Sequence, residues 1–413
     1  MADAARERIA ALDLIRGVAV LGILAVNIAG FAGPPSATYT PSIPVPASAA
    51  DEWAFAAMFW LFEGKMRALF SLLFGASMLL FVERADEQGR DGQALQLRRL
   101  GWLALFGYLH FLLLWWGDIL FLYAVAGTIA LALRKASAPA LVGSGLALFL
   151  FWQLAGTALS LSDAAIEQAA LARPDDAALQ QRIAAIKAPY RAQDAADMAE
   201  ARRNWGAQVT AKLTERPFYP LRVTLFAIGE TLPYMLLGMA LLRTGFFSGQ
   251  WPARRLRQIV LAGLGLGGAV SLWAALWARA AHFPEMTMRL LVNYALGLPH
   301  LAMALGYAAL LMLAAARLTR SRPGHLLMAA GRMAFSNYLG TSLVMGALFY
   351  GWGLGLFARH GAAAHWLFVL LGWVLMLAWS TPWLARFRQG PLEWLWRSAT
   401  EWRAQPLRRR ATS

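Results

Sequence analysis

The chain has 413 residues, of which 59% are hydrophobic and only 15% are charged. This composition excludes an ordinary soluble domain and predicts a polytopic membrane protein. The formal net charge of +15 does not indicate nucleic-acid binding, because the basic residues cluster at the ends of apolar runs and in the C-terminal tail, where orientation in the membrane and anionic headgroups explain them. With no cysteine, the chain has neither a disulfide framework nor a thiolate nucleophile.

The first apolar segment, at residues 12–32, predicts an uncleaved membrane span, because a signal peptide has a shorter apolar core. Asp13 and Arg16 lie three residues apart at its start and are expected to pair on one helical face. Residues 34–51 contain five prolines and neither lysine nor arginine, which favours an extended external loop.

The next apolar stretch, residues 53–82, is interrupted by Glu63, Gly64, Lys65 and Arg67. This charged break favours an interfacial first part and a membrane crossing that begins at about residue 66. Residues 83–99 are charged and are expected to form a cytoplasmic loop.

Residues 101–133 form one apolar run with Arg98 and Arg99 before it and Arg134 and Lys135 after it. A straight helix of this length would measure about 50 Å, against about 30 Å for the hydrocarbon core of a bilayer. Splitting the run at residues 116–118 gives a central hairpin over 100–133 with both basic ends on one side of the membrane.

We expect five spans in residues 1–161 and five more in residues 218–385. Residues 162–217 between them are rich in alternating charges and predict an external helical segment. The later spans are expected at 140–161, 218–242, 259–281, 290–316, 326–350 and 366–385. A basic tail with an interfacial helix follows at 386–413. We therefore expect an all-α bundle of about ten transmembrane helices in a bacterial inner membrane, with both termini cytoplasmic.

Five local patterns resemble the YeiB-type family of bacterial membrane proteins. They are LDLIRGVAVLGILAVN at 12–27, K-x-R-x-LFSLLFGAS at 65–77, GYLHFLLLWWGDILFLYAVAG at 107–127, GRMAFSNYL at 331–339 and FRQGPLEWLWR at 387–397. The resemblance covers nearly the whole chain in the right order, apart from residues 162–216.

That family is similar to the transmembrane acyltransferases, which include heparan-alpha-glucosaminide N-acetyltransferase and the acyltransferase-3 proteins. The shared pattern is L-D-x-x-R-G in the first span, followed by a polar residue near its outer end, here Asn27. The resemblance implies transfer of an acyl group, such as acetyl, from cytoplasmic acyl-CoA to an extracytoplasmic hydroxyl or amine. The chain has no histidine between Asn27 and Lys65, so it departs from both histidine placements known in those enzymes.

Acyl transfer needs a base or acyl carrier and donors for the developing oxyanion. His110 is the candidate base or carrier, with Asp118 beyond i, i+4 reach on a straight helix but able to fold back at the hairpin tip. Lys65 is a candidate to place positive charge beside an oxyanion or an acidic acceptor, and Asn27 is a candidate donor to a carbonyl. The structural alternatives are an interhelical hydrogen bond for His110 or Asn27 and a helix cap for Asp118. Arg67 is expected to reach the lipid headgroups.

Arg332, Asn337 and Arg16 are candidate ligands of the CoA phosphates. The alternatives are anchoring of a helix end for Arg332 and the ion pair with Asp13 for Arg16. His300, next to a proline within a span, is a second-rank candidate for lining a pore.

Two other classes of function remain open on the sequence: a transporter or flippase that moves a solute or lipid-linked molecule without bond making, and a structural membrane partner. The expected partners are membrane lipids and acyl-CoA, and broad aromatic and glycine faces permit a homodimer without requiring one.

Overall fold

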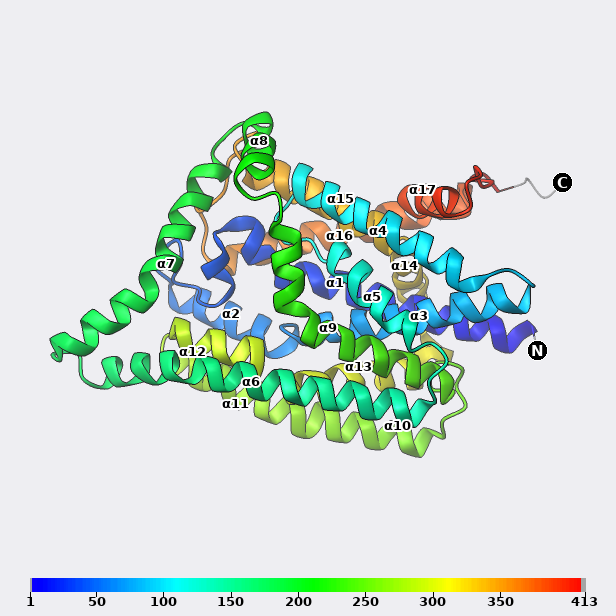
Figure 1. The fold of residues 1–413 in the computed structure, drawn as a ribbon, viewed down its shortest axis with the longest axis horizontal. Coiled ribbons are helices and arrows are strands. Elements are labelled where there is room, and N and C mark those ends of the chain that lie inside the picture. Colours follow the sequence, from blue (N-terminus) through cyan, green and yellow to red (C-terminus); the bar gives the residue numbers. More distant parts are fainter. Residues whose placement is uncertain (1, 410–413) are drawn as a thin grey trace.

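The computed structural model describes residues 2–409, with side chains from residue 10 onward, and this part of the chain is helical without any extended strand. Most of the helices lie roughly along one direction, with α7 (Ala177–Ala201) inclined to them, and both ends of the chain are at one end of the bundle (Figure 1). We call this end the basic end and the opposite end the distal end. The basic end carries the loops 88–91, 133–137, 244–252 and 319–321. The prediction of an all-helical fold is confirmed.

The helices have the following bounds: α1 (Ala2–Ala32), η1 (Pro35–Thr38), α2 (Ala49–Leu61), α3 (Lys65–Glu87), α4 (Gly92–Leu113), α5 (Leu120–Ala132), α6 (Ala138–Ala172), α7 (Ala177–Ala201), α8 (Trp205–Glu215), α9 (Tyr219–Arg243), α10 (Ala253–Val260), η2 (Leu261–Gly267), α11 (Gly268–Ala280), α12 (Glu285–Leu290), η3 (Leu291–Ala295), α13 (Gly297–Leu318), α14 (Arg322–Arg332), α15 (Ala334–Phe349), α16 (Ala362–Arg386) and α17 (Pro391–Thr400).

Seven helical segments among the described residues are long and apolar enough to cross a membrane. They are Ala10–Ala32, Ala49–Glu87, Ala138–Ala172, Tyr219–Arg243, Ala253–Ala280, Gly297–Leu318 and Ala362–Arg386. A chain with this many apolar helices is a multi-pass membrane protein. Helix α5 is apolar but shorter, at 13 residues.

The expected break between residues 62 and 65 is present, because α2 ends at Leu61 and α3 begins at Lys65. Gly64 between them has φ +74°, and a Cβ atom built there would lie 2.1 Å from Nδ1 of His300. Only glycine accommodates both this backbone conformation and the close approach of the imidazole.

Two pairs of helices pack with their backbones in contact at glycines. A Cβ atom on Gly238 of α9 would lie 1.9 Å from the carbonyl oxygen of Leu72 in α3, and one on Gly75 of α3 would lie 2.1 Å from that of Met235 in α9. Gly17 of α1 and Gly331 of α14 approach each other's helices in the same way. Small residues at such crossings are typical of helix packing in membranes.

The central hairpin forms as predicted, since α4 ends at Leu113 and α5 begins at Leu120. Asp118 accepts a hydrogen bond from the backbone N–H of Phe121 at 2.8 Å, so the predicted helix cap is confirmed. Gly107 of α4 lets the two arms approach, because a Cβ atom there would lie 2.3 Å from the same backbone nitrogen. The tip of the hairpin is therefore tightly folded.

Candidate functional site

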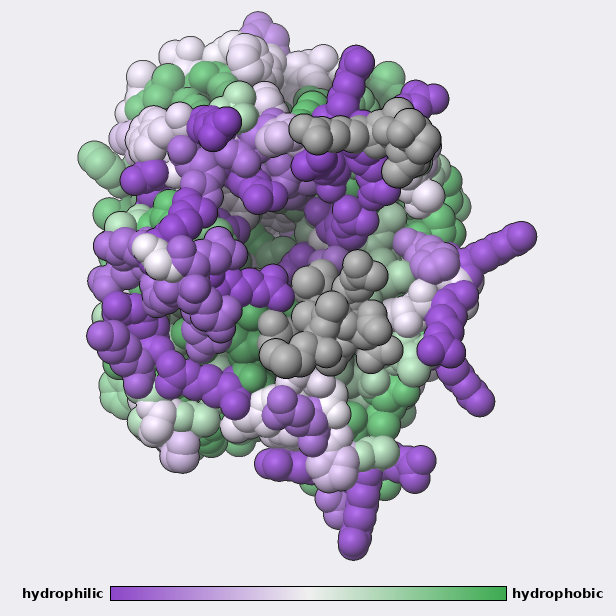
Figure 2. All heavy atoms as spheres, turned by 90° about the vertical axis from the view of Figure 1, so that its right-hand side faces the viewer, coloured by the Kyte–Doolittle hydropathy of each residue, from purple (hydrophilic) through white to green (hydrophobic). Residues whose placement is uncertain are grey.

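A cavity of about 510 Å³ opens at the basic end, between α1, α3, α4, α5, α15 and α17, and we call it the basic cavity. Its polar lining includes six arginine side chains: Arg16, Arg84, Arg90, Arg99, Arg332 and Arg397. Phe70, Leu73, Phe74, Leu103 and Leu120 give it an apolar part. Figure 2 shows hydrophilic side chains around a hollow in this face of the molecule.

A second cavity, of about 340 Å³, lies toward the distal end, and we call it the aromatic cavity. Its aromatic lining residues are Tyr39, Trp115, Trp116, Tyr123, Trp152, Tyr219, Phe226, Tyr234 and Tyr294. It also contains the carboxylates Glu63, Asp118 and Glu230 and the guanidinium groups of Arg67 and Arg289. The mixture of aromatic surface with a few charged groups is typical of small-molecule sites.

The two cavities are adjacent at Ile119 and Tyr123, which line both of them. These residues are four apart in sequence, so they lie on one side of the N-terminal part of α5. The Tyr123 hydroxyl is hydrogen-bonded to the Ser71 hydroxyl at 2.7 Å. Tyr338, which lines the basic cavity, donates to the carbonyl of Gly117, which lines the aromatic cavity. A thin layer of side chains thus separates the two cavities.

His110 and Asp118 form a buried pair at the hairpin tip. Nδ1 of His110 lies 2.8 Å from Oδ1 of Asp118, and Nε2 lies 2.9 Å from the Ser342 hydroxyl in α15. The His110 side chain lines neither cavity, whereas Asp118 lines the aromatic cavity. The imidazole therefore lies behind the wall of the aromatic cavity, next to Asp118 and Trp115, which both line it.

Asn27 in α1 also lines the aromatic cavity. It borders a separate void of about 10 Å³, whose lining includes Tyr338 and Ser342, the hydrogen-bonding partner of His110. A void of this size is about one water molecule wide. Asn27 thus shares the aromatic cavity with Asp118 and the small void with Ser342.

Lys65 lies away from both cavities. Its side chain is fully buried, and Nζ donates a 2.8 Å hydrogen bond to the carbonyl of Phe59 near the C-terminal end of α2. This carbonyl is at the negative end of the helix dipole, so the lysine stabilises the break between α2 and α3. His300 is also fully buried and packs against this break, and its ring has no hydrogen-bonding partner in the described part of the chain.

The expectation that Arg67 reaches the lipid headgroups is wrong. Its guanidinium lines the aromatic cavity, 3.3 Å from the carboxylate of Glu63 and 3.8 Å from that of Glu230. Glu230 lies in α9, far along the chain, and this contact holds the arginine in the protein interior. Two carboxylates in a low-dielectric site attract the guanidinium more strongly than the headgroup region does.

Arg332 and Arg16, two of the three candidate phosphate ligands, line the basic cavity. Arg332 also donates to the backbone carbonyl of Arg388, and Arg16 is bonded to Asp13 at 2.9 Å and to Ser77 at 3.0 Å, as the predicted pair requires. Asn337 lies outside the cavity. Its amide bonds Ala330, Ser380 and Trp379, and so joins α14, α15 and α16.

The short helix α17 closes one side of the basic cavity. Its Glu393 accepts hydrogen bonds from the backbone N–H groups of Phe335 and Ser336 and from the Ser336 hydroxyl, at the start of α15. Arg99 lies between the rings of Phe81 and Trp396, at 4.1 and 4.4 Å from their centres. The first contact attaches α17 to α15, and the second attaches it to α3 and α4.

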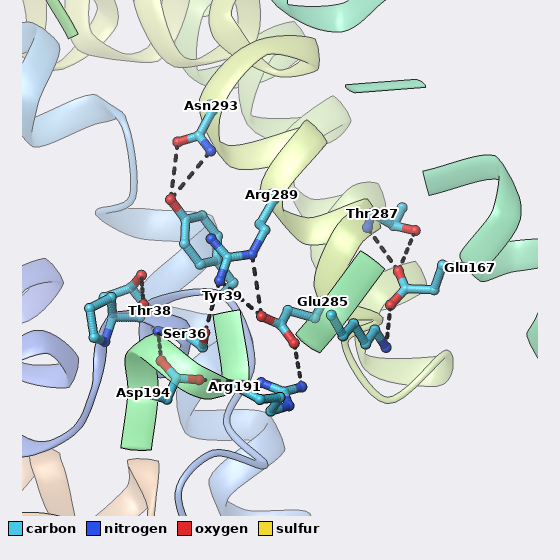
Figure 3. Close-up of polar contacts among 12 residues, drawn as sticks. Ser36, Thr38, Tyr39, Glu167, Arg191, Asp194, Glu285, Thr287, Arg289 and Asn293 are labelled. Atoms are coloured by element: carbon cyan, nitrogen blue, oxygen red, sulfur yellow. Dashed lines mark hydrogen bonds and ion pairs between the residues drawn. The ribbon is translucent and has the colours of Figure 1, made fainter. Parts of the chain in front are cut away.

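A network of polar contacts holds α7 against the distal end (Figure 3). Glu285 of α12 pairs with Arg191 of α7 and with Arg289, and Arg289 also donates to the Ser36 hydroxyl. Asp194 of α7 accepts from the backbone N–H of Ser36. Since Arg289 lines the aromatic cavity, the segment 162–217 is connected to the wall of this cavity.

Helix α8 caps the C-terminal end of α4. Nζ of the buried Lys212 donates to the carbonyl of Phe111 at 3.0 Å, and the indole N–H of Trp205 donates to that of Leu113 at 2.8 Å. Carbonyls at the end of a helix lack intrahelical partners, so these bonds stabilise the end of α4 next to His110.

Burial lowers the pKa of Lys212 to about 8, from its ordinary value of 10.5. Between these two values the unfolded chain binds more protons than the folded chain, so the contribution of Lys212 to stability rises with pH through this window. We expect the free energy of unfolding of the wild type, relative to that of Lys212→Met, to rise from pH 7.5 to 9.5 by up to about 1.4 kcal/mol per pH unit. Thermal unfolding at several pH values measures this difference. Lys135→Met, at an exposed position, is the control, and a pH-independent difference between wild type and Lys212→Met would contradict this expectation.

Sequence reasoning did not select Tyr123, Ser71, Ile119 or Tyr338, the residues at the junction. Apolar and aromatic residues in spans are common, and nothing in their spacing distinguishes these four. It also did not select Glu230 as a partner of Arg67, although a carboxylate within an apolar span is a recognisable signal.

In the described part of the chain, a helical bundle with seven apolar segments long enough to span a membrane and with two cavities between its helices defines the class of the molecule: an all-α, multi-pass membrane protein with space for ligands.

Comparison with known proteins gives the family. Residues 241–403 match the model described as "Protein of unknown function (DUF418)". The chain is 32% identical over 409 residues to YxaH of Bacillus subtilis (strain 168), covering 97% of this chain and 96% of the relative. It is 31% identical over 411 residues to YeiB of Escherichia coli (strain K12), covering 95% and 96%. No solved structure matches. The chain belongs to the YeiB-type family.

Proposed function

We propose that this protein is a transmembrane acyltransferase that moves an acyl group from cytoplasmic acyl-CoA to a hydroxyl or amine on the other side of a bacterial inner membrane. The observation that carries the proposal is the meeting of two chemically different cavities at Ile119 and Tyr123. A reaction between a donor from one side and an acceptor from the other needs such a meeting point.

The basic cavity is the proposed site of the acyl-CoA. Six arginines and two glutamates, Glu393 and Glu401, line it, which suits a ligand with several phosphate charges. The apolar part that leads to Tyr123 suits the uncharged arm that carries the thioester. Acyl-CoA combines these two kinds of surface in one molecule.

The proposed orientation follows from the charges. Ten helical passes, formed by α1, α3, α4, α5, α6, α9, α10–α11, α13, α14–α15 and α16, would place both termini and the basic end in the cytoplasm, as the positive-inside rule expects. The basic cavity then receives acyl-CoA from the cytoplasm, and the aromatic cavity receives the acceptor from outside.

Asp118 is the proposed general base, because it is the member of the buried pair that lines the acceptor's cavity. The acceptor oxygen or nitrogen forms a bond to the thioester carbonyl carbon, the C–S bond breaks, and the acceptor's proton passes through Asp118 to the CoA thiolate. In this proposal His110 orients the carboxylate, and Asn27 donates to the thioester carbonyl. No covalent intermediate on His110 is required.

Purified protein incubated with radiolabelled acetyl-CoA and a panel of sugars, amines and lipid headgroup compounds tests the proposal. Labelled acceptor together with free CoA is the expected result. If the protein binds no CoA, the proposal is wrong.

Binding alone gives a sharper prediction. We expect Arg332→Gln to weaken CoA binding by about 10- to 100-fold, because one hydrogen bond to a charged group contributes about 1.5–3 kcal/mol. Arg254→Gln, at an exposed position of α10 near the basic end, removes the same charge outside the cavity and is the matched control. Isothermal titration calorimetry measures the affinity of both variants for CoA. Equal losses of affinity would show that the basic cavity is not the binding site.

A transporter is the second candidate, and the position of His110 away from both cavities favours it. In this case the two cavities would be the two sides of one path, and a solute would cross without bond making. Binding of CoA without turnover on any acceptor would support the transporter over the enzyme.

A further inference from the structure

Tyr123 occupies the junction between the two cavities. Its side chain is 3% exposed, its ring centre lies 5.1 Å from that of Phe74 and 5.8 Å from that of Phe70, and its hydroxyl bonds Ser71 of α3. Phe70 and Phe74 line the basic cavity, whereas Ser71 lines the aromatic cavity. The ring therefore extends from α5 to α3 across the place where the cavities meet.

We propose that Tyr123 closes the junction between the two cavities and that its size limits the acyl group that can cross. The closure is independent of the function proposed above, whereas the limit on acyl size rests on it. In this proposal, acetyl is small enough to pass the ring after a small side-chain movement, and a longer chain does not pass while the ring is in place.

The physical basis is the packing around the ring. A buried aromatic side chain fills space that neighbouring side chains cannot fill without moving, so removing it leaves a cavity. At this position the new cavity would lie between two existing ones and would join them. The hydrogen bond to Ser71 adds a second restraint, because it fixes the end of the ring to the opposite helix.

The absence of cysteine from the chain allows a direct test with single reporter cysteines. Gln88→Cys reports on the basic cavity and Thr231→Cys on the aromatic cavity. A membrane-impermeant thiol reagent is applied to sealed vesicles on whichever face labels Gln88→Cys, so the test does not depend on the orientation of the protein.

We expect Thr231→Cys to resist labelling from that face when Tyr123 is present and to react at least about tenfold faster with Tyr123→Ala. Tyr123→Phe keeps the ring and loses the hydroxyl, and we expect Thr231→Cys to resist labelling in this variant. This comparison distinguishes the effect of the ring from that of its hydroxyl. Tyr307→Ala is the matched control, since this tyrosine of α13 bonds the carbonyl of Leu61 and lines neither cavity. Thermal unfolding of each purified variant, compared with the same reporter protein that keeps Tyr123, shows whether the variant is folded.

If Thr231→Cys is labelled at the same rate with Tyr123 and with Tyr123→Ala, the proposal that Tyr123 closes the junction is wrong. If Tyr123→Ala does not fold, Tyr123→Leu, which keeps an apolar side chain, takes its place in the same assay with the same two outcomes.

A second experiment tests the limit on acyl size by comparing acetyl-CoA with hexanoyl-CoA as donors. We expect Tyr123→Ala to raise the ratio of hexanoyl to acetyl transfer at least about tenfold over the wild type. An unchanged ratio would overturn the size limit. If the wild type transfers neither group, the acyltransferase proposal fails and the size limit fails with it, while the labelling result still decides the closure.

Discussion

Gly238→Ala is expected to destabilise the protein strongly. The new methyl group would lie 1.9 Å from the carbonyl oxygen of Leu72, which belongs to the backbone of α3 and cannot rotate away. Helices α3 and α9 would have to separate, with an expected loss of about 2–4 kcal/mol in the free energy of unfolding. The measurement is the thermal unfolding of purified protein in detergent.

Gly340→Ala is the matched control for this experiment. Gly340 is also a helical glycine, in α15, but a Cβ atom there meets no other atom within 4 Å. Because alanine favours the helix over glycine, we expect a stabilisation of up to about 1 kcal/mol. If the two substitutions lower the thermal midpoint equally, the close contact between α3 and α9 is not present in the membrane protein.

Asp118→Asn is expected to lower the rate of acyl transfer by about 10²- to 10⁴-fold, the usual contribution of a general base. Asparagine is isosteric and caps a helix as well as aspartate does, so the start of α5 should be preserved. The binding of CoA should not change, because Asp118 does not line the basic cavity. Initial rates with labelled acetyl-CoA and calorimetry with CoA separate the two effects.

Asp91→Asn supplies the control. Asp91 caps α4 by accepting from the backbone N–H of Ala94, in the same way as Asp118 caps α5, but it lines neither cavity. It should leave both the rate and the binding unchanged. Transfer by Asp118→Asn at the wild-type rate would exclude Asp118 as the base.

The elements of the fold could be predicted from the sequence largely because they depend on local signals. The hairpin followed from the length of one apolar run and the basic residues at its ends, and the break before Lys65 followed from three charged residues and a glycine in an apolar stretch. Such signals are read within about twenty residues. They need no knowledge of which helices become neighbours.

The candidate site could be predicted only in part, because its contacts join distant segments. Asp118 approaches His110 at the fold of the hairpin, a contact that helical spacing does not predict. Arg67 meets Glu230 of α9, and the expectation for a lone arginine at the end of a span was therefore wrong. The junction at Tyr123 depends on the packing of α3 against α5, which no local pattern encodes.

Helix α6 has a practical consequence for experiments. Its 35 residues measure about 52 Å, so it extends well beyond a hydrocarbon core of about 30 Å. Together with α7, which pairs with α6 through Lys187–Glu167 and with α12 through Arg191–Glu285, it forms a projection on one side of the molecule. A small soluble domain inserted in the turn at residues 173–176 would give this compact molecule an asymmetric marker for particle alignment in electron cryomicroscopy.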